Sequence, residues 1–358
     1  MSYRIPVGPY HIALEEPYKI EVECEGERVK SAYLKVGFNF RGIEWLAQRK
    51  NITKVIALVE RVCGICSNVH SMTFCMALET IGAVEVPERA KYIRVVVAEL
   101  ERLHSHLLWA GVAAELVGFQ TVFMHVFRLR ERVMDLLEQI SGNRVNYSMN
   151  RIGGVNRDIT EPAKVLEGVA EIRRVVTESV VPVFTTDVTV QARCRGVGVL
   201  TRSDAIALGA VGPLARASGL DMDLRRDNPY LAYDKLKFAV PVQPAGDVLA
   251  RVVVRALEML ESCSMIEQAI EGMPQGPLHS GDVYSVPAGE AIVRSEAPRG
   301  EVFYYVESDG SDTVARLKIR TPTFLNIPTV AVMVRDNEFA DVPLIQASVD
   351  PCYSCTDR

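Results

Sequence analysis

The sequence predicts an α+β protein that is mainly α-helical and carries β-hairpins at its periphery. Apolar residues recur at the spacing of amphipathic helices through much of the chain between residues 87 and 272. Alternating apolar and polar residues, which are typical of half-buried strands, occur at residues 19–36 and 301–320. The chain has 358 residues, of which 48% are hydrophobic, so it can bury a large core.

The elements follow in order along the chain. The run "KIEVECEGERVKSAYLKV" predicts a hairpin that turns at Gly26. The helices of the core are predicted at residues 67–82, 87–119, 121–140, a segment with Thr160 as N-cap and Pro162 in its first turn, and residues 247–272, ended by Gly272. The run "EVFYYVESDGSDTVARLKIR" predicts a second hairpin that turns near Asp309 and Gly310.

Charge and hydropathy exclude several classes of protein. A formal net charge of -5 gives no reason to expect nucleic acid or another polyanion as partner. The opening "MSYRIPVGPYHIALEEP" lacks the basic and then apolar pattern of a secretion signal. No uncharged apolar run reaches the roughly 18 residues of a transmembrane helix. We therefore expect a reducing compartment without disulfides, and contact with a membrane only through other subunits.

Two pairs of cysteines share one spacing, Cys63 with Cys66 and Cys352 with Cys355. Paired C-x-x-C motifs are typical of metal ligands, and four soft thiolates suit zinc, an iron–sulfur centre or nickel. The first pair precedes a predicted helix, whose N-terminus favours thiolate. His70 follows Cys66 by four residues, so it is expected on the same helix face as a hydrogen-bond donor to the sulfur, with an ordinary hydrogen-bonded core histidine as the alternative. The other four cysteines are expected to be small buried apolar residues.

The sequence around these pairs is more specific than the spacing. "RVCGICSNVH" and the C-terminal "DPCYSCTDR" resemble two signatures of the large subunit of nickel–iron hydrogenases, R-x-C-G-x-C-x-x-x-H and D-P-C-x-x-C. "FNFRGIEWL", "EAPRGE" and "PTFLN" extend the resemblance over nearly the full length. "GPYHIALEEP", "LERLHSHLLWAG" and "FRLRERVMDLLEQISGNR" are most similar to the energy-converting, membrane-associated branch (group 4). They also resemble the quinone-chamber subunit of respiratory complex I, which lacks the four ligand cysteines.

The resemblance implies the nickel–iron hydrogenase large-subunit fold as a single domain over residues 1–358. Its expected parts are an N-terminal hairpin at about 18–38, a helical core at about 63–275, a hairpin at about 300–320 and a metal-closing segment at 348–358. The closing segment is expected to be a mobile strand that covers the site once metal is inserted. We expect Arg358 to be the encoded end of the chain, and closure to need no proteolysis.

The resemblance also implies a nickel–iron centre whose iron carries carbon monoxide and cyanide. Cys63 and Cys352 match the terminal ligands of nickel, and Cys66 and Cys355 match the ligands that bridge nickel and iron. The expected reaction is reversible heterolytic cleavage of H2.

Four further residues match positions around that centre. Arg299 matches an arginine over the site, where it is expected as a charge and hydrogen-bond donor rather than a base, because its pKa exceeds about 12. Pro298 is expected to shape the same wall. Thr323 matches a hydroxyl that meets a cyanide, with an ordinary turn hydroxyl as the alternative. Asp350 is expected to orient Arg299 or the final loop, or simply to cap that loop.

Two glutamates carry further expectations. Glu16 is expected to relay protons beside a terminal cysteine; the alternatives are Glu15, one residue away in register, and a solvated loop carboxylate. Glu44 matches a glutamate that holds magnesium or iron in other branches, together with a C-terminal histidine. This sequence ends in "TDR" instead, which puts that metal in doubt, and a direct pair between Glu44 and Arg358 is the alternative.

Electrons must leave through another polypeptide, because no ferredoxin-type run of cysteines is present. The resemblance implies an iron–sulfur small subunit, further hydrophilic and membrane subunits that couple H2 evolution to ion pumping, and ferredoxin as the electron partner. It places the chain at the cytoplasmic face of the cell membrane. Two competing hypotheses remain: a complex I-like electron-transfer scaffold without nickel, and a structural zinc protein.

Overall fold

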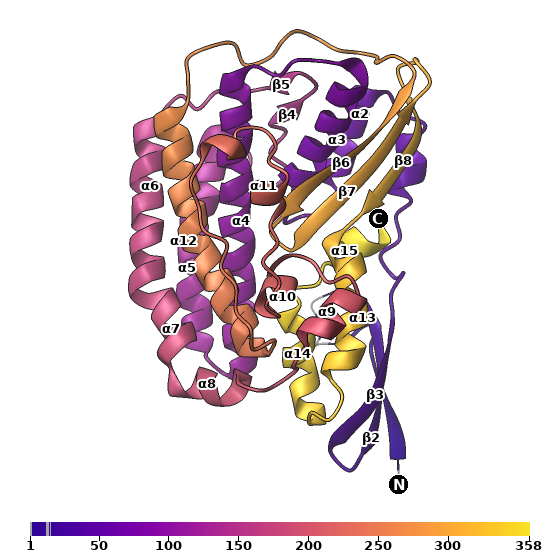
Figure 1. Cartoon of the computed structure of the whole chain (residues 1–358), viewed down its shortest axis with the longest axis vertical. Coiled ribbons are helices and arrows are strands. Elements are labelled where there is room, and N and C mark those ends of the chain that lie inside the picture. Colours follow the sequence, from indigo (N-terminus) through magenta and orange to yellow (C-terminus); the bar gives the residue numbers. More distant parts are fainter. Residues whose placement is uncertain (1, 12–13, 15) are drawn as a thin grey trace.

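A bundle of long helices forms one side of the molecule, and a sheet and a group of short C-terminal helices flank it (Figure 1). The computed structural model describes residues 2–11, 14 and 16–358. The helices are α1 (Ile43–Ala47), α2 (Ile52–Glu60), α3 (Ser67–Gly82), α4 (Glu88–Val117), α5 (Gln120–Ser141), α6 (Pro162–Val175), α7 (Val181–Thr186), α8 (Val188–Cys194), α9 (Arg202–Ala207), α10 (Gly212–Ala217), α11 (Leu224–Asp227), α12 (Val248–Gly272), α13 (Pro322–Met333), α14 (Val342–Ser348) and α15 (Tyr353–Asp357). A π-helical turn (Val176–Val180) and two 3-10 turns (Tyr233–Lys235 and Phe339–Asp341) complete the helical elements described.

The bundle is built around α4, which packs against α5 and α12. Most of α4 is buried on all sides, so it shows less amphipathic periodicity than α5, which has one face toward solvent. Helix α12 begins where the Asp247 carboxylate accepts the N–H of Ala250 at 2.8 Å. The prediction that Thr160 is the N-cap of α6 is wrong: Glu161 is the N-cap, and Pro162 is the first helical residue.

Each predicted hairpin belongs to a three-stranded antiparallel sheet. The strands are β1 (Ser2–Val7), β2 (Lys19–Glu25), β3 (Arg28–Lys35), β4 (Asn150–Arg151), β5 (Gly154–Val155), β6 (Gly289–Ala297), β7 (Gly300–Ser308) and β8 (Val314–Arg320). The expected hairpins are β2–β3 and β7–β8; β1 adds to β2, and β6 adds to β7. The alternation of apolar and polar residues is weak in β1 and β6, so the sequence predicted only two strands for each sheet.

The C-terminal segment is helical, whereas the sequence analysis expected a strand. Asp350 separates α14 from α15 with a left-handed φ of 58°, which an aspartate tolerates better than most residues do. Cys352 then occupies the N-cap of α15, and its sulfur accepts the N–H of Cys355 at 3.4 Å. The C-x-x-C spacing therefore places both sulfurs on one helical turn.

The second apolar core of the molecule surrounds all four cysteines of the two pairs. It joins α2 and α3 to the sheet β6–β8, apart from the main core of the bundle. Among the residues that the structure describes, no helix combines the length and the apolar character that crossing a bilayer requires.

Candidate metal centre

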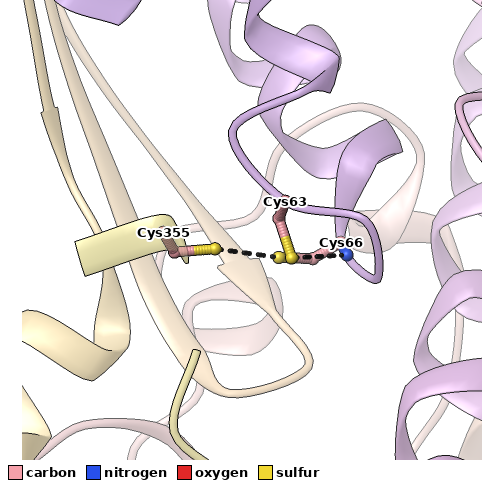
Figure 2. A group of neighbouring side chains, drawn as sticks. All are labelled: Cys63, Cys66 and Cys355. Carbon is pink, nitrogen blue, oxygen red and sulfur yellow. Dashed lines mark hydrogen bonds between the residues drawn. The ribbon is translucent and has the colours of Figure 1, made fainter. Parts of the chain in front are cut away.

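Four buried thiols from opposite ends of the chain meet at one point. The Sγ atoms of Cys63, Cys66 and Cys355 lie within 4.8 Å of one another. Figure 2 shows these three side chains directed toward each other from the loop before α3 and from α15. The fourth sulfur, of Cys352, lies 3.6 Å from that of Cys63 and 3.0 Å from that of Cys355. Each of the four residues is at most 3% exposed.

The loop before α3 prepares the first pair for metal binding. The Cys63 sulfur accepts the N–H groups of Ile65 at 3.3 Å and Cys66 at 3.2 Å. Cys66 is the N-cap of α3, so the positive end of the helix dipole faces the sulfurs. Hydrogen bonds from the other three thiols lower the pKa of Cys63 well below its ordinary value. Burial raises the pKa of Cys355 well above its ordinary value, and a bound cation would favour its thiolate form.

The donor chemistry fits a centre of soft metal ions. Four sulfurs in an apolar, water-excluded core match nickel, iron or zinc and do not match magnesium or calcium, which prefer oxygen ligands. The cysteine motif is therefore consistent with a nickel–iron site. No second group of three or more metal-binding side chains occurs within the described part of the chain.

His70 contacts a different sulfur from the one that its spacing suggested. Its Nε2 lies 3.7 Å from the Sγ of Cys355 rather than bonding to Cys66, because Cys66 lies outside the helix at the N-cap. Its Nδ1 lies 2.8 Å from the hydroxyl of Tyr304 on β7. Burial lowers the pKa of His70 to about 4, so the imidazole is neutral. The tautomer with its proton on Nε2 would donate to the Cys355 sulfur and would accept from the Tyr304 hydroxyl at Nδ1.

Arg299 lies in the two-residue turn between β6 and β7, preceded by the buried Pro298. Its Nη2 donates to Asp350 Oδ1 at 2.6 Å, its Nε to the Asp350 carbonyl at 2.8 Å and its Nη1 to Ser105 Oγ at 3.1 Å. Although burial lowers it, the charges of Asp350 and the cysteine sulfurs raise the pKa of Arg299 well above its ordinary value. Arg299 is thus a fixed positive charge beside the sulfurs and cannot act as a base.

Thr323 lies in the first turn of α13, and its Oγ1 accepts the N–H of Cys352 at 2.9 Å. This bond fixes the backbone of a metal-ligand candidate. A hydroxyl that accepts in this way can still donate its own proton to a ligand at the site.

Glu16 lies beside the segment that carries the second cysteine pair. Its Oε2 accepts the N–H of Ser354 at 2.6 Å and the amide of Asn39 at 3.4 Å. Burial raises its pKa above the ordinary value, and the charge of Cys63 acts in the same direction. A carboxyl with a raised pKa can hold a proton and release it again. The alternative candidate, Glu15, lies outside the described residues.

Sequence reasoning missed several residues that hold the site together. Arg41 donates to the carbonyls of Arg61 at 2.5 Å, Val62 at 2.9 Å and Ser354 at 2.6 Å, so it ties both cysteine loops together. The Tyr304 hydroxyl bonds to the His70 ring and fixes its orientation, and the Ser105 hydroxyl accepts a hydrogen bond from Arg299. Of these residues, only Tyr304 had a signal in the sequence, because it lies at an inward position of the alternating β7 run. The carbonyls that Arg41 binds are main-chain groups, which no residue type identifies.

Two family profiles match most of the chain. The family profile described as "Respiratory-chain NADH dehydrogenase, 49 Kd subunit" matches residues 117–285 and 281–358. The profile described as "Nickel-dependent hydrogenase" matches residues 41–110, which contain the first cysteine pair.

Two relatives and one solved structure align nearly end to end. The chain is 42% identical to the carbon monoxide-induced hydrogenase of Rhodospirillum rubrum, covering 100% of this chain and 99% of that protein. It is 44% identical to the membrane-bound hydrogenase subunit alpha of Pyrococcus furiosus, covering 99% and 87%. A chain in the solved structure of "the membrane-bound sulfane sulfur reductase (MBS), an archaeal respiratory membrane complex" gives a TM-score of 0.95 at 34% identity, covering 100% and 98%.

Proposed function

Because the chain belongs to the family of large subunits of energy-converting nickel–iron hydrogenases, which is related to the 49 kDa subunit of respiratory complex I, we propose that it catalyses the reversible cleavage of H2. The observation that carries this proposal is the convergence of four buried thiols from the two ends of the chain. A complex I-like subunit that only transfers electrons has no need of four such thiols.

We propose that the four cysteines would hold a nickel–iron centre, with Cys63 and Cys352 as ligands of nickel and Cys66 and Cys355 as ligands shared by nickel and iron. When bound, the centre, with carbon monoxide and cyanide on iron, supplies the redox chemistry that separates H2 into protons and electrons. The chain's own residues keep water away from the centre, since all four cysteines are buried in an apolar core. His70 supports Cys355 by donating to its sulfur.

Arg299 and Thr323 are the proposed donors to the diatomic ligands. The Arg299 guanidinium is held on three sides by Asp350 and Ser105, so its orientation is fixed before any ligand binds. Pro298 restricts the turn that presents it. Thr323, in α13, accepts the N–H of Cys352, and its own hydroxyl proton would be donated to a diatomic ligand.

Glu16 is the proposed first proton acceptor outside the thiolates. Burial raises its pKa above the ordinary value, and its bond to the Ser354 N–H keeps the carboxyl next to the cysteine-bearing turn. A proton that leaves the protonated thiol of a terminal cysteine, giving back the thiolate, would pass to this carboxyl and then outward.

We infer the partners from the relatives. Two relatives are named as membrane-bound assemblies, a hydrogenase and an archaeal respiratory complex. We propose that this chain likewise joins a multi-subunit membrane complex through other subunits, at the cytoplasmic face. An iron–sulfur small subunit would carry electrons between this chain and ferredoxin, and membrane subunits would couple the reaction to ion translocation.

A second candidate function comes from the solved relative. That protein is named a sulfane sulfur reductase, yet its fold matches with a TM-score of 0.95. A chain of this fold could therefore serve an electron-transfer complex that does not turn over H2. The four thiols would then hold either no nickel or a structural zinc.

Metal analysis of the purified complex separates these functions. The hydrogenase proposal expects equimolar nickel and iron in this subunit, together with infrared bands of bound cyanide and carbon monoxide. Zinc alone would support a structural site, and absence of metal in this chain would support the electron-transfer scaffold. A Cys66→Ser variant serves as the control, because its spectrum should lose those bands.

A further inference from the structure

The carboxylate of Glu44 is already occupied by side-chain cations. Its Oε1 accepts from Arg358 Nε and from the N–H of Ile319, each at 2.9 Å, and its Oε2 accepts from Lys318 Nζ at 2.8 Å. Although burial raises it, these hydrogen bonds lower the pKa of Glu44 below its ordinary value. The glutamate at this position matches one that holds magnesium or iron in other branches, a metal that the C-terminal "TDR" put in doubt, and the residues present do not fit such an ion. The structure instead contains the alternative, a direct pair between Glu44 and Arg358. A hard cation requires free oxygen ligands and is repelled by two positive groups.

Arg358 binds the same short segment through its main chain as well. Its main-chain oxygen accepts the N–H groups of Arg41 at 3.3 Å, Gly42 at 3.1 Å and Ile43 at 3.5 Å, at the start of α1. The first turn of a helix has unpaired N–H groups and a partial positive charge, so this oxygen satisfies the helix end. Glu44, in the same turn, binds the guanidinium. Arg358 is therefore held both through its main-chain oxygen and through its guanidinium.

The neighbouring Asp357 adds further hydrogen bonds to the N-terminal part of the chain. Its two carboxylate oxygens accept the N–H of Gly37 at 2.9 Å and of Asn39 at 2.8 Å. The guanidinium carbon of Arg358 also lies 5.7 Å from the ring centre of Phe324, within the range of a cation–π contact. All of these contacts act on the end of α15, directly after Cys355.

We propose that Arg358, with Lys318, takes the place of a bound divalent cation at Glu44 and locks α15 over the four-thiol site. The guanidinium and the ammonium carry two positive charges, as a divalent ion does, but they belong to the chain and cannot be removed by a chelator. An arginine suits this role because its charge is permanent and its planar group donates in fixed directions. The role does not depend on which reaction the metal centre catalyses.

Hydrogen–deuterium exchange at residues 353–357 in the purified complex tests the proposal without an activity assay. In the wild-type protein, neither EDTA nor Mn²⁺ should change the exchange rate. Arg358→Ala should accelerate exchange there by about 10- to 100-fold, the effect of losing charge-assisted hydrogen bonds. Arg316→Ala, which removes an exposed arginine of the same strand as Lys318, should leave the rate unchanged.

A designed exchange of ligands makes the test sharper. Arg358→His combined with Lys318→Ala frees Glu44 and adds an imidazole, so this double variant should bind Mn²⁺, seen by electron paramagnetic resonance, and should recover slow exchange only when Mn²⁺ is present. Adding Glu44→Gln should abolish that binding. Three results would overturn the proposal: chelator-sensitive protection in the wild type, unchanged exchange in Arg358→Ala, or no Mn²⁺ binding by the double variant.

Discussion

The guanidinium of Arg299 and the carboxylate of Asp350 form a buried ion pair with an Nη2 to Oδ1 distance of 2.6 Å. Arg299 also donates to the Asp350 carbonyl, two residues before Cys352. The pair thus joins the β6–β7 turn to the segment that supplies two of the four thiols. Each residue is at most 4% exposed, so breaking the pair would leave an uncompensated buried charge.

Arg299→Lys should reduce H2 turnover by about 100-fold or more while nickel and iron remain bound. Lysine keeps the positive charge but cannot reproduce three donor directions toward Asp350 and Ser105. Turnover, metal content and the cyanide infrared bands are measured on the same preparation. Arg294→Lys, at an exposed position on β6, is the matched control and should keep normal turnover. Normal turnover in Arg299→Lys would remove Arg299 from the proposed donors.

Cys355→Ser should lose both nickel and iron, because a bridging position serves two ions and a hydroxyl is a harder, less acidic ligand than a thiol. Elemental analysis of the purified subunit measures this directly. Cys75→Ala controls for the loss of a buried thiol, since Cys75 lies within α3 and outside the four-thiol group. Wild-type metal content in Cys355→Ser would contradict the assignment of the site.

Glu16→Gln should slow H2 evolution by orders of magnitude without shifting the infrared bands, because the amide keeps the shape but cannot carry the proton. Glu16→Asp should recover part of the rate. Glu21→Gln, at a more exposed carboxyl on β2, should evolve H2 normally. If Glu16→Gln turns over normally, the relay belongs to another carboxyl, and Glu15→Gln becomes the variant to measure.

The sequence predicted the candidate metal ligands of the site better than it predicted the strands and turns that position them. The two C-x-x-C motifs marked the four thiols, and helical periodicity marked α3 and the long helices. The strand β6 was not predicted, because the alternation in "GEAIVRSEA" is broken at Ile292, which lies on the face of the charged residues Glu290, Arg294 and Glu296, while the other face carries mostly small residues. As a result, Pro298 and Arg299 could not be recognised as the turn of a hairpin.

The direct pair between Glu44 and Arg358 was one of the two alternatives for Glu44 and is present in the structure. The other contacts that hold the C-terminal segment could not be predicted, because they use main-chain groups. Arg41 binds carbonyls, Asp357 binds N–H groups, and Arg358 uses its own main-chain oxygen. None of these partners has a characteristic residue type. The contact of His70 with Cys355 instead of Cys66 could not be predicted either. It depends on α3 beginning at Ser67, one residue after Cys66, and a sequence does not define a helix end that closely.

Glu296→Gln should flatten the pH dependence of stability between about pH 4.5 and 7. Burial, and then the charge of Asp223, raises the pKa of Glu296 from 4.5 to about 7. The folded chain therefore binds more protons than the unfolded chain in this window, so the wild-type free energy of unfolding falls as pH rises. The fall attributable to Glu296 is at most about 1.4 kcal/mol per pH unit. Denaturant unfolding of both proteins from pH 5 to 8 measures it, and equal slopes would contradict the assignment.

Gly212→Ala should disturb the site through Arg299 rather than through backbone strain. Gly212 has a left-handed φ of 66°, and a Cβ there would lie 2.5 Å from the Arg299 carbonyl oxygen and 2.5 Å from the Gly300 Cα. These are backbone atoms, so the turn that presents Arg299 must move. A displacement of about 1 Å at a catalytic group can reduce turnover by about 100-fold.

Gly209→Ala separates the two causes, because Gly209 has nearly the same φ, 67°, but no atom within 4 Å of an added Cβ. Both variants should lose about 1–2 kcal/mol of stability from placing alanine in the left-handed region. Only Gly212→Ala should also lose H2 turnover and shift the cyanide bands, since only its Cβ reaches the turn that carries Arg299. Equal turnover in the two variants would show that the turn absorbs the added methyl group and that the position of Arg299 does not depend on Gly212.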